Sequence, residues 1–295
     1  MKIAIIGGAG KMGQWLARFL KQNGFEVILA DRAKTKLDVA CRELGVIKAT
    51  TKYAVKNSDV VLFSVPIDKF ESTIKEASAF IHAGQTIIDV TSVKAMPVRI
   101  MHNYIKNGTV LGTHPLFGPG AREIANLNIV LTPTDKNENY LAQKVKEYLE
   151  KRKANITIMT PEEHDDMMTV ILGLSHYVAL IAADTLSGYD TKILGNVSGV
   201  TYKLLLTLVQ SVISEDPDFY GTLQMSLPKL PQLHAKFIDK AELWSELVRN
   251  KDKDGFIRRM KRLNKILNKD SNLFQSYEDM YKITQGIQLK NEKSR

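Results

Sequence analysis

Lys2-Ile3-Ala4-Ile5-Ile6-Gly7-Gly8-Ala9-Gly10-Lys11-Met12-Gly13 is the stretch that decides the fold of this chain. Its first half is a short apolar run rich in branched side chains, which is typical of a buried parallel strand. Its second half is a glycine turn. Apolar residues then recur at helical spacing, at Trp15, Leu16, Phe19 and Leu20, and a second apolar run over 27–30 ends at Asp31. The stretch therefore predicts a strand–helix–strand unit.

Each glycine of the turn has a physical purpose in a dinucleotide site. Gly8 allows the tight turn, Gly10 lets the backbone approach a pyrophosphate, and Gly13 lets the helix pack against the strand. Lys11 and Met12 begin the helix, whose free N–H groups face an anion. We predict that these five residues bind a dinucleotide. The alternative is a glycine turn that serves packing alone.

Two further segments complete the predicted cofactor site. Asp31, at the tip of the second strand, is placed to accept hydrogen bonds from a ribose 2′-hydroxyl, which favours NAD because a 2′-phosphate would be repelled. Arg32 beside it leaves NADP open. Ser64, Val65 and Pro66 end another apolar run at the edge where open α/β sheets hold their ligands.

Strand and helix patterns alternate over the first half of the chain. Strands are predicted at 60–66, 86–90, 110–112, 128–131 and 156–159, with helices at 35–44, 70–80 and 138–151. Such alternation predicts a Rossmann-type, doubly wound α/β domain. Thr160-Pro161-Glu162-Glu163 is a helix-start signal, and helical patterns follow to 186 and over 200–213, 219–227, 233–249 and 256–267. We predict a dinucleotide-binding domain over 1–159 and an all-α domain over 160–295.

The composition limits the class of protein. The 295 residues are 44% hydrophobic and 25% charged, which is typical of a soluble globular chain. Cys41 is the one cysteine and is interpreted as a core residue in a reducing compartment. We see no signal-peptide pattern and no run long and apolar enough to span a bilayer, so we expect a cytoplasmic protein. No cluster has metal-ligand spacing.

The net charge of +9 is uneven, because 249–269 holds nine Lys or Arg against two Asp. Such a segment could bind nucleic acid. An apolar stripe at helical spacing runs through it, however, at Phe256, Met260, Leu263, Ile266 and Leu267. The stripe favours an amphipathic helix whose basic residues face water, so a nucleic-acid partner is not expected.

Two polar residues follow neighbouring predicted strands at the edge that holds the glycine turn. Ser92 follows the strand at 86–90, and His114 follows the strand at 110–112. An imidazole beside a nicotinamide can take the proton of an alcohol while a hydride leaves its carbon. Ser92 could orient that imidazole or bond the same hydroxyl. The alternative for His114 is a loop histidine held by the turns at Pro115 and Pro119.

Four segments carry a resemblance to a known family. They are Asp89-Val90-Thr91-Ser92-Val93-Lys94, Gly112-Thr113-His114-Pro115-Leu116-Phe117-Gly118-Pro119, Glu163-His164-Asp165 and Leu174-Ser175-His176-Tyr177. Together they closely resemble the prephenate dehydrogenase family, which includes arogenate and cyclohexadienyl dehydrogenases, from Lys2 to roughly Tyr277. The resemblance implies oxidative decarboxylation of prephenate to 4-hydroxyphenylpyruvate, the dehydrogenase step of tyrosine biosynthesis, with NAD as hydride acceptor.

The resemblance also implies residue roles. His114 matches the catalytic histidine, Ser92 the serine that supports it, and His176 a second histidine that faces the site from the helical domain. Lys203 stands where the family commonly has an arginine that holds a substrate carboxylate. Lysine is a point charge and not a bidentate fork, which leaves arogenate open as the substrate. His164 is interpreted as a domain-boundary contact.

The leading hypothesis is therefore an NAD-dependent prephenate dehydrogenase that works alone, without a fused chorismate mutase or amino-acid-sensing domain. The resemblance further implies a homodimer formed through the helical domain. Arogenate dehydrogenase is one alternative, and a 3-hydroxyacid or imine reductase on the same architecture is another. A dinucleotide-sensing or nucleic-acid-binding module is the alternative without enzyme activity.

Overall fold

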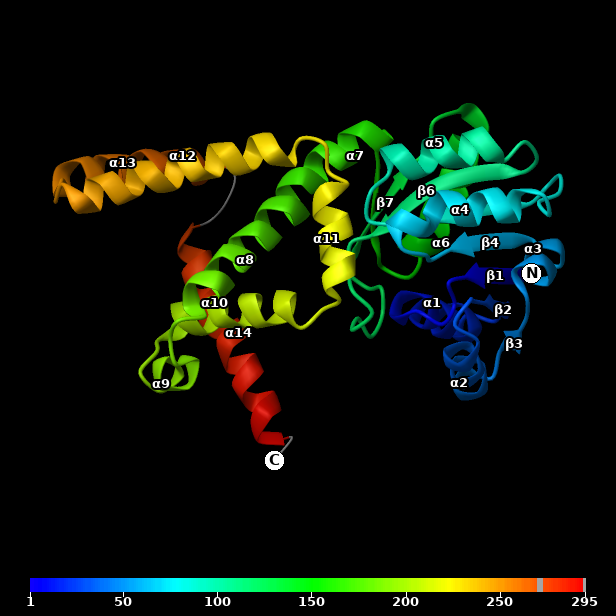
Figure 1. Cartoon of the computed structure of the whole chain (residues 1–295), viewed down its shortest axis with the longest axis horizontal. Helices are drawn as coiled ribbons and strands as arrows, with labels where there is room; N and C mark the ends of the chain where they lie inside the picture. The colour runs from blue at the N-terminus through cyan, green and yellow to red at the C-terminus, as the bar shows by residue number, and fades with distance from the viewer. Residues whose placement is uncertain (270–272, 294–295) are drawn as a thin grey trace. The chain divides into compact units, whose positions relative to one another are not determined.

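The computed structural model describes residues 1–269 and 273–293. The chain divides into two compact units (Figure 1). Unit 1 consists of Met1–Met168 with Gly221–Leu227, and unit 2 of Thr169–Tyr220 with Pro228–Arg295. Unit 1 is the α/β part, and unit 2 is helical wherever its secondary structure is regular and described. The predicted domain division after residue 159 stays a prediction.

The described part of unit 1 contains one sheet of eight strands in the order β3-β2-β1-β4-β5-β6-β7-β8. The strands are β1 (Lys2–Ile6), β2 (Glu26–Ala30), β3 (Ile47–Lys48), β4 (Val60–Phe63), β5 (Thr86–Asp89), β6 (Thr109–Pro115), β7 (Asn128–Thr132) and β8 (Asn155–Ile158). Neighbours pair in parallel, except for β6 with β7. The first six strands therefore end at one edge of the sheet, and the order turns back between β1 and β4, where such sheets bind ligands.

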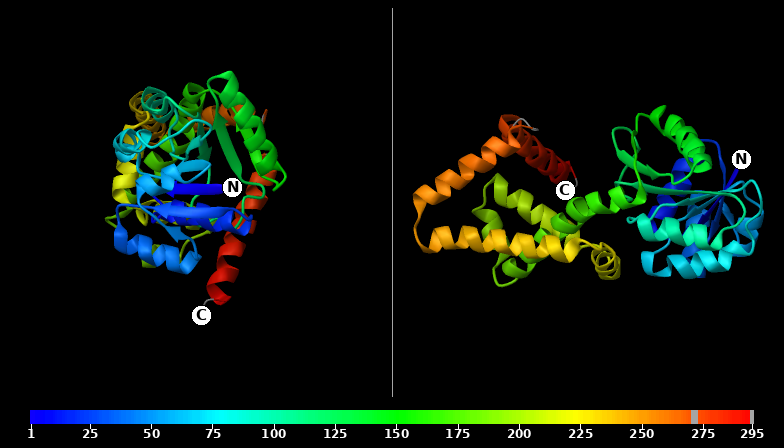
Figure 2. Two further views of the ribbon diagram at one scale, coloured as in Figure 1. Left: turned by 90° about the vertical axis from the view of Figure 1, so that its right-hand side faces the viewer. Right: turned by 90° about the horizontal axis from the view of Figure 1, so that it is seen from above.

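Each face of the sheet has its own core, because successive side chains of a strand point to opposite faces. Ile3 and Ile5 belong to the core covered by α1 (Lys11–Gln22), α2 (Lys34–Leu44) and α6 (Lys136–Glu150). Ala4 and Ile6 belong to the core covered by α3 (Thr51–Lys56), α4 (Ile67–Ser78) and α5 (Ala95–Tyr104). Figure 2 gives two further views of these helices around the sheet. The predicted doubly wound domain is confirmed.

The end of β6 departs from the prediction. No helix lies between Pro115 and Asn128 in this fully described stretch, and β7 returns antiparallel to β6. A parallel neighbour would need a crossover, which usually contains a helix. β6 is also longer than predicted, because His114 pairs with Val130 and Pro115 with Ile129. His114 is therefore part of the strand end and not of the loop after it.

The glycine turn between β1 and α1 is tight, but its positive φ lies at Gly7 and not at Gly8, to which the sequence pattern assigns the turn. Gly7 has a φ of +85°, and a Cβ built on it would lie 2.2 Å from the carbonyl oxygen of Ser64. A Cβ on Gly13 would lie 2.4 Å from the carbonyl oxygen of Gly7. Only glycine leaves room for β1, β4 and α1 to meet at this point.

Gly7→Ala should destabilise unit 1 more than Gly24→Ala does. Both glycines have a positive φ, of +85° and +82°, but a Cβ on Gly24 meets nothing within 4 Å. The control variant, Gly24→Ala, should therefore lose only the free energy that corresponds to the strained backbone conformation, about 1–2 kcal/mol. Gly7→Ala adds overlap with the Ser64 backbone, about 1–3 kcal/mol more. Urea unfolding measures both, and equal losses would mean that the turn relaxes around the added methyl.

Unit 2 is built from helices. They are α8 (Ser175–Leu186), α9 (Thr191–Asn196), α10 (Val200–Ile213), α12 (Leu230–Arg249), α13 (Lys253–Leu267) and α14 (Leu273–Lys293), while α11 (Pro217–Met225) contributes to both units. Trp244 of α12 packs edge-to-face on Phe256 of α13, with ring centroids 4.8 Å apart. The segment Thr169–Leu174 is a π-helix that joins α7 (Pro161–Met168) to α8. The predicted long helix is therefore present but contains one wider turn.

The helical residues from Pro161 to Leu186 contradict the expectation that no run in this chain is long and apolar enough to span a bilayer. This helix of 26 residues is by length and composition long enough and apolar enough to cross a membrane, with a mean hydropathy of 1.6 in its most apolar window. The expectation was wrong because Ser175 and His176 interrupt the run of apolar side chains but lower its mean hydropathy only a little. Core helices of soluble proteins pass the same test, so one such helix is weak evidence for a span. Only 22% of the window is buried within this chain.

Candidate active site

The start of α1 is open to an anion. Gly10 is the N-cap, no side chain caps the helix, and its first turn contains no acidic residue. A Cβ on the exposed Gly10 would approach only the Gly7 carbonyl oxygen, at 3.3 Å. Lys11 is exposed and Met12 packs on the core beneath. The free N–H groups of a helix start attract phosphate, so this turn fits the pyrophosphate of a dinucleotide.

Asp31 lies against the glycine turn. Its Oδ2 accepts a hydrogen bond from the Ala9 N–H at 3.0 Å, and its Oδ1 accepts one from the Ala33 N–H at 2.9 Å. A carboxylate has further lone pairs for ribose hydroxyls. Arg32 behaves differently, because its Nη2 lies 3.3 Å from Oε2 of Glu76 in an exposed ion pair. In this arrangement Arg32 is engaged with α4.

Ser64, Val65 and Pro66 border the same turn. The Ser64 N–H donates to the Ile6 carbonyl oxygen at 2.8 Å, which continues the pairing of β4 with β1. A Cβ on Gly7 would also come within 3.0 Å of Cγ1 of Val65. Pro66 is exposed and is the N-cap of α4. The structure therefore brings together the two predicted halves of the cofactor site.

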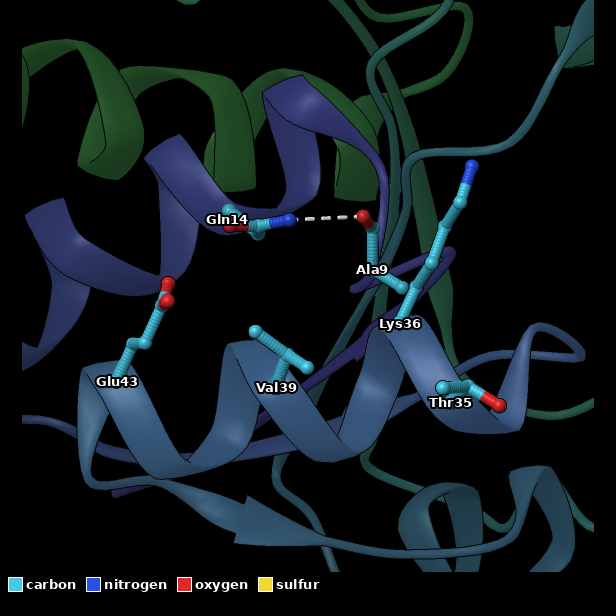
Figure 3. Close-up of a pocket in the computed structure, with 6 residues that line it drawn as sticks. All are labelled: Ala9, Gln14, Thr35, Lys36, Val39 and Glu43. Carbon is cyan, nitrogen blue, oxygen red and sulfur yellow. Dashed lines mark hydrogen bonds between the residues drawn. The ribbon is translucent and has the colours of Figure 1, made fainter.

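A shallow pocket of about 270 Å³ lies behind this turn, between α1 and α2 (Figure 3). Its lining consists of Ala9, Gln14, Thr35, Lys36, Val39 and Glu43. Gln14 donates a hydrogen bond to the Ala9 carbonyl oxygen at 2.9 Å across it. None of the predicted site residues lines this pocket, and it therefore has no role in the site described below.

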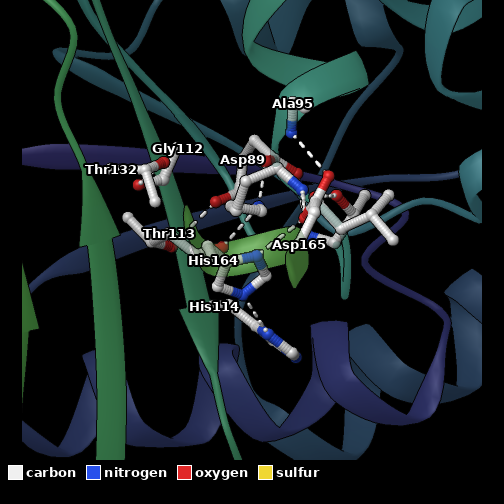
Figure 4. A network of polar contacts seen from close by, with 11 residues as sticks. Asp89, Ala95, Gly112, Thr113, His114, Thr132, His164 and Asp165 are labelled. Atoms are coloured by element: carbon white, nitrogen blue, oxygen red, sulfur yellow. Dashed lines mark hydrogen bonds and ion pairs between the residues drawn. The ribbon is translucent and has the colours of Figure 1, made fainter. Parts of the chain in front are cut away.

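His114 is buried at the end of β6 and contacts a second histidine (Figure 4). Its Nδ1 lies 2.9 Å from Nε2 of His164, and the two rings meet edge-to-face. Nδ1 of His164 lies 2.8 Å from Oδ1 of Asp165. No hydrogen bond from the described residues reaches Nε2 of His114. That nitrogen is therefore the one available to a substrate.

The burial of His114 and the charges near it favour its neutral form. Burial, the nearby Lys94 and His164 together hold the pKa of His114 well below its usual 6.5. Lys94 is fully buried, and its Nζ pairs with Asp89 and donates to the Thr113 carbonyl oxygen at 2.6 Å. Burial also lowers the pKa of Lys94, against the opposing pull of Asp89. A neutral imidazole can accept a proton, so His114 is suited to act as a general base.

Of the two roles expected for Ser92, a hydrogen bond to the His114 imidazole is absent from the described structure. Ser92 is half-buried on the connection from β5 to α5, and no hydrogen bond joins it to His114 in this described stretch. The partner of the His114 ring is His164 instead. Ser92 follows β5 at the same strand edge, one strand away from His114.

His176 and Lys203 belong to unit 2. His176, on α8, packs edge-to-face on Tyr220 with ring centroids 4.6 Å apart. Its Nδ1 is buried without a hydrogen-bond partner, and burial lowers its pKa. Lys203 is half-buried on α10. No hydrogen bond or ring contact joins the two residues within the described helices.

The sequence interpretation missed His164. The sequence predicts a domain-boundary contact, whereas His164 is fully buried and lies directly against His114. The signal that could have found it is the adjacent pair His164-Asp165, because a carboxylate that bonds one ring nitrogen of a histidine fixes the tautomer of that ring.

Two family models match the chain. Residues 16–167 match a model described as prephenate dehydrogenase, nucleotide-binding domain. Residues 160–262 match a second model, described as prephenate dehydrogenase, dimerization domain.

Individual relatives agree with these models. The chain is 33% identical to the probable arogenate/prephenate dehydrogenase of Methanocaldococcus jannaschii, over 99% of this chain and 67% of that protein. It is 29% identical to the T-protein of Haemophilus influenzae, over 87% of this chain and 64% of that protein. The chain thus spans about two thirds of the length of these curated relatives.

Solved structures share the fold. Prephenate dehydrogenase from A. aeolicus, in complex with hydroxyphenyl propionate and NAD+, has a TM-score of 0.74 at 23% identity, over 92% of this chain and 98% of that chain. Synechocystis arogenate dehydrogenase has a TM-score of 0.68 at 20% identity, over 92% of this chain and all of that chain. Because a family model matches half of its length and a relative is 33% identical along nearly all of it, this chain belongs to the prephenate dehydrogenase family.

Proposed function

We propose that this chain is an NAD-dependent dehydrogenase that converts prephenate to 4-hydroxyphenylpyruvate by oxidative decarboxylation. The observation that carries the proposal is His114, a buried imidazole of low pKa at the sheet edge that also holds the glycine turn. Membership of a family of prephenate and arogenate dehydrogenases supports the reaction type. NAD is proposed because Asp31 borders the turn while Arg32 is paired with Glu76.

In the proposed reaction, Nε2 of His114 accepts the proton of the ring hydroxyl. NAD, when bound, supplies the acceptor for the hydride that leaves the same ring carbon. That carbon becomes a carbonyl which draws electrons, and departure of carbon dioxide then makes the ring aromatic. Ser92 is proposed to bond the same hydroxyl. His176 and Lys203, from residues 160–295, are proposed to bind the rest of the substrate, which carries two carboxylates.

Arogenate is the second candidate substrate. The M. jannaschii relative carries both substrates in its name. Lys203 offers a carboxylate one point charge, whereas arginine would offer a planar fork. Arogenate has an amino group where prephenate has a keto group, so the two differ in charge at the end far from the ring hydroxyl.

We also propose that the protein is a cytoplasmic homodimer. Residues 160–262 match a dimerization domain, and no side chain of α13 is buried in the single chain although the helix carries an apolar stripe. The exposed residues of this stripe are Met260, Leu263, Ile266 and Leu267. A second copy of residues 160–295 would cover such a surface. In this proposal residues 1–159 bind the cofactor.

The test is a rise in absorbance at 340 nm when the purified protein is given prephenate and NAD. The expected result is turnover with prephenate that exceeds turnover with arogenate, and with NAD that exceeds NADP. Each substrate is assayed with each cofactor at several concentrations, so that kcat/KM is compared. If neither substrate is oxidised with either cofactor, the dehydrogenase assignment fails. A preference for arogenate would retain the reaction and replace the substrate.

A further inference from the structure

His114, His164 and Asp165 form a chain of side-chain contacts in which each ring nitrogen of His164 has its own partner. Nε2 of His164 lies 2.9 Å from His114, and Nδ1 lies 2.8 Å from Asp165. His164 is fully buried, while His114 and Asp165 are 5% and 7% exposed. Water is therefore largely excluded, so the contacts among these three side chains determine which ring nitrogen of each histidine carries a proton.

Asp165 is held as a hydrogen-bond acceptor from three directions. Its Oδ1 accepts from the Lys94 N–H at 2.7 Å, and its Oδ2 accepts from the Ala95 N–H at 2.9 Å. These donors are the first N–H groups of α5, where the helix dipole favours a negative charge. The ammonium group of Lys94 adds a positive charge nearby. The third direction is His164, whose Nδ1 must carry a proton to donate to this carboxylate.

The proton on Nδ1 of His164 decides the tautomer of His114. A neutral imidazole has one N–H and one lone pair, so Nε2 of His164 is an acceptor. Nδ1 of His114 must then be the donor, and the lone pair of His114 is at Nε2. The opposite tautomer would place two lone pairs against each other at 2.9 Å. Only Nε2 is free of the described protein groups.

We propose that His164 and Asp165 are positioning residues that hold His114 in the Nδ1–H tautomer, with its lone pair at Nε2 aimed at the substrate hydroxyl. The inference rests on the proposed function of His114 as the general base. When Nε2 takes up the substrate proton, the Nδ1–H of His114 still donates to His164. The negative charge of Asp165 then stabilises the positive charge on the His114 ring through His164. Neither His164 nor Asp165 has to gain or lose a proton.

The tautomer itself is the first test and requires no substrate. Full-length protein labelled with ¹⁵N at histidine is examined by NMR at neutral pH, and His114 is assigned by the loss of its signals in His114→Asn. The expected pattern is a protonated Nδ1 and an unprotonated Nε2, which is the minor tautomer of free histidine. A protonated Nε2 on His114 would overturn the proposal, whatever the enzyme assays give.

Two variants test the positioning role. Asp165→Asn presents an amide that can donate to His164 and so reverse both tautomers, and His164→Phe removes the contact while keeping a ring. Each should lower kcat by about 10²-fold or more while KM changes by only a few-fold. In His164→Phe the His114 ring should also show the Nε2–H tautomer.

The matched control is His102→Phe. His102 is another histidine paired with a carboxylate of unit 1, at 2.6 Å from Glu138, and it lies outside the chain of contacts. It should leave kcat and the His114 signals unchanged. If the positioning variants keep kcat within a few-fold of wild type, His164 and Asp165 are structural and the proposal fails. If the tautomers are as expected but prephenate and arogenate are inert, the proposed function fails instead.

Discussion

His114→Asn should lower kcat by about 10²- to 10⁴-fold, because it removes the group proposed to accept the substrate proton. Asparagine is close in shape to the near half of the imidazole and can still donate to Nε2 of His164, which now lies 2.9 Å from Nδ1 of His114. The fold and the substrate pocket should therefore persist, and KM should change little. Steady-state kinetics with NAD and the preferred substrate measure both constants.

The control for this variant is His82→Asn, since His82 is an exposed histidine of the same unit. It should have wild-type kinetics. A rise in KM at unchanged kcat for His114→Asn would mean that His114 binds the substrate and transfers no proton. The size of the loss in kcat thus separates a base from a binding residue.

Lys94→Met should lower the free energy of unfolding by about 3–5 kcal/mol, because it leaves the buried carboxylate of Asp89 without its cation. Both side chains are fully buried in the wild-type protein. The Thr91 N–H, 2.7 Å from Asp89, would be the main remaining donor to that carboxylate. Adding Asp89→Asn to Lys94→Met removes the buried charge and should recover much of the loss. Urea unfolding of the single and double variants measures the difference.

An exposed ion pair serves as the control for the buried pair of Lys94 and Asp89. Lys2 and Glu26 are 3.3 Å apart with side chains 48% and 47% exposed, so Lys2→Met should cost less than about 1 kcal/mol. A similarly small cost for Lys94→Met would show that the buried pair contributes little to stability.

Lys94→Met should also move the acid limb of the pH profile. His114 must be neutral to act as a base, and burial and Lys94 hold its pKa well below 6.5. Wild-type kcat/KM should therefore be level through neutral pH and fall only in more acidic solution. Without the charge of Lys94 the pKa of His114 rises, and the limb should move toward neutral pH. The same depressed pKa lowers stability in acid, because below pH 6.5 the unfolded chain binds a proton that the folded His114 does not.

The glycine turn could be predicted from the sequence because its physics is local. The strand before it, the turn and the helix after it are contiguous, and a Cβ on Gly13 would meet Gly7 and Gly8, which the turn itself brings close. The position of His114 at the correct sheet edge follows from strand order alone. Its place inside β6 does not, because the pairing of His114 with Val130 depends on a strand that returns antiparallel.

The contacts of His164 could not be predicted in the same way. His114 and His164 are far apart in the chain and meet only through tertiary packing, in which α7 contacts α5 and β7. The burial of Lys94 could not be predicted for a different reason, since a lysine is rarely buried. The helix α5 was missed because Asp165, distant in sequence, supplies the acceptors for its first N–H groups.

Asp165 has a consequence for how such a protein can evolve. The same carboxylate completes the first turn of α5 and orients His164, so natural selection for a stable fold and selection for an active site act on one side chain. A lineage that abandons the reaction would still have reason to keep the aspartate. An aspartate at this position in a distant descendant would therefore indicate shared ancestry, but it would not by itself indicate the same reaction.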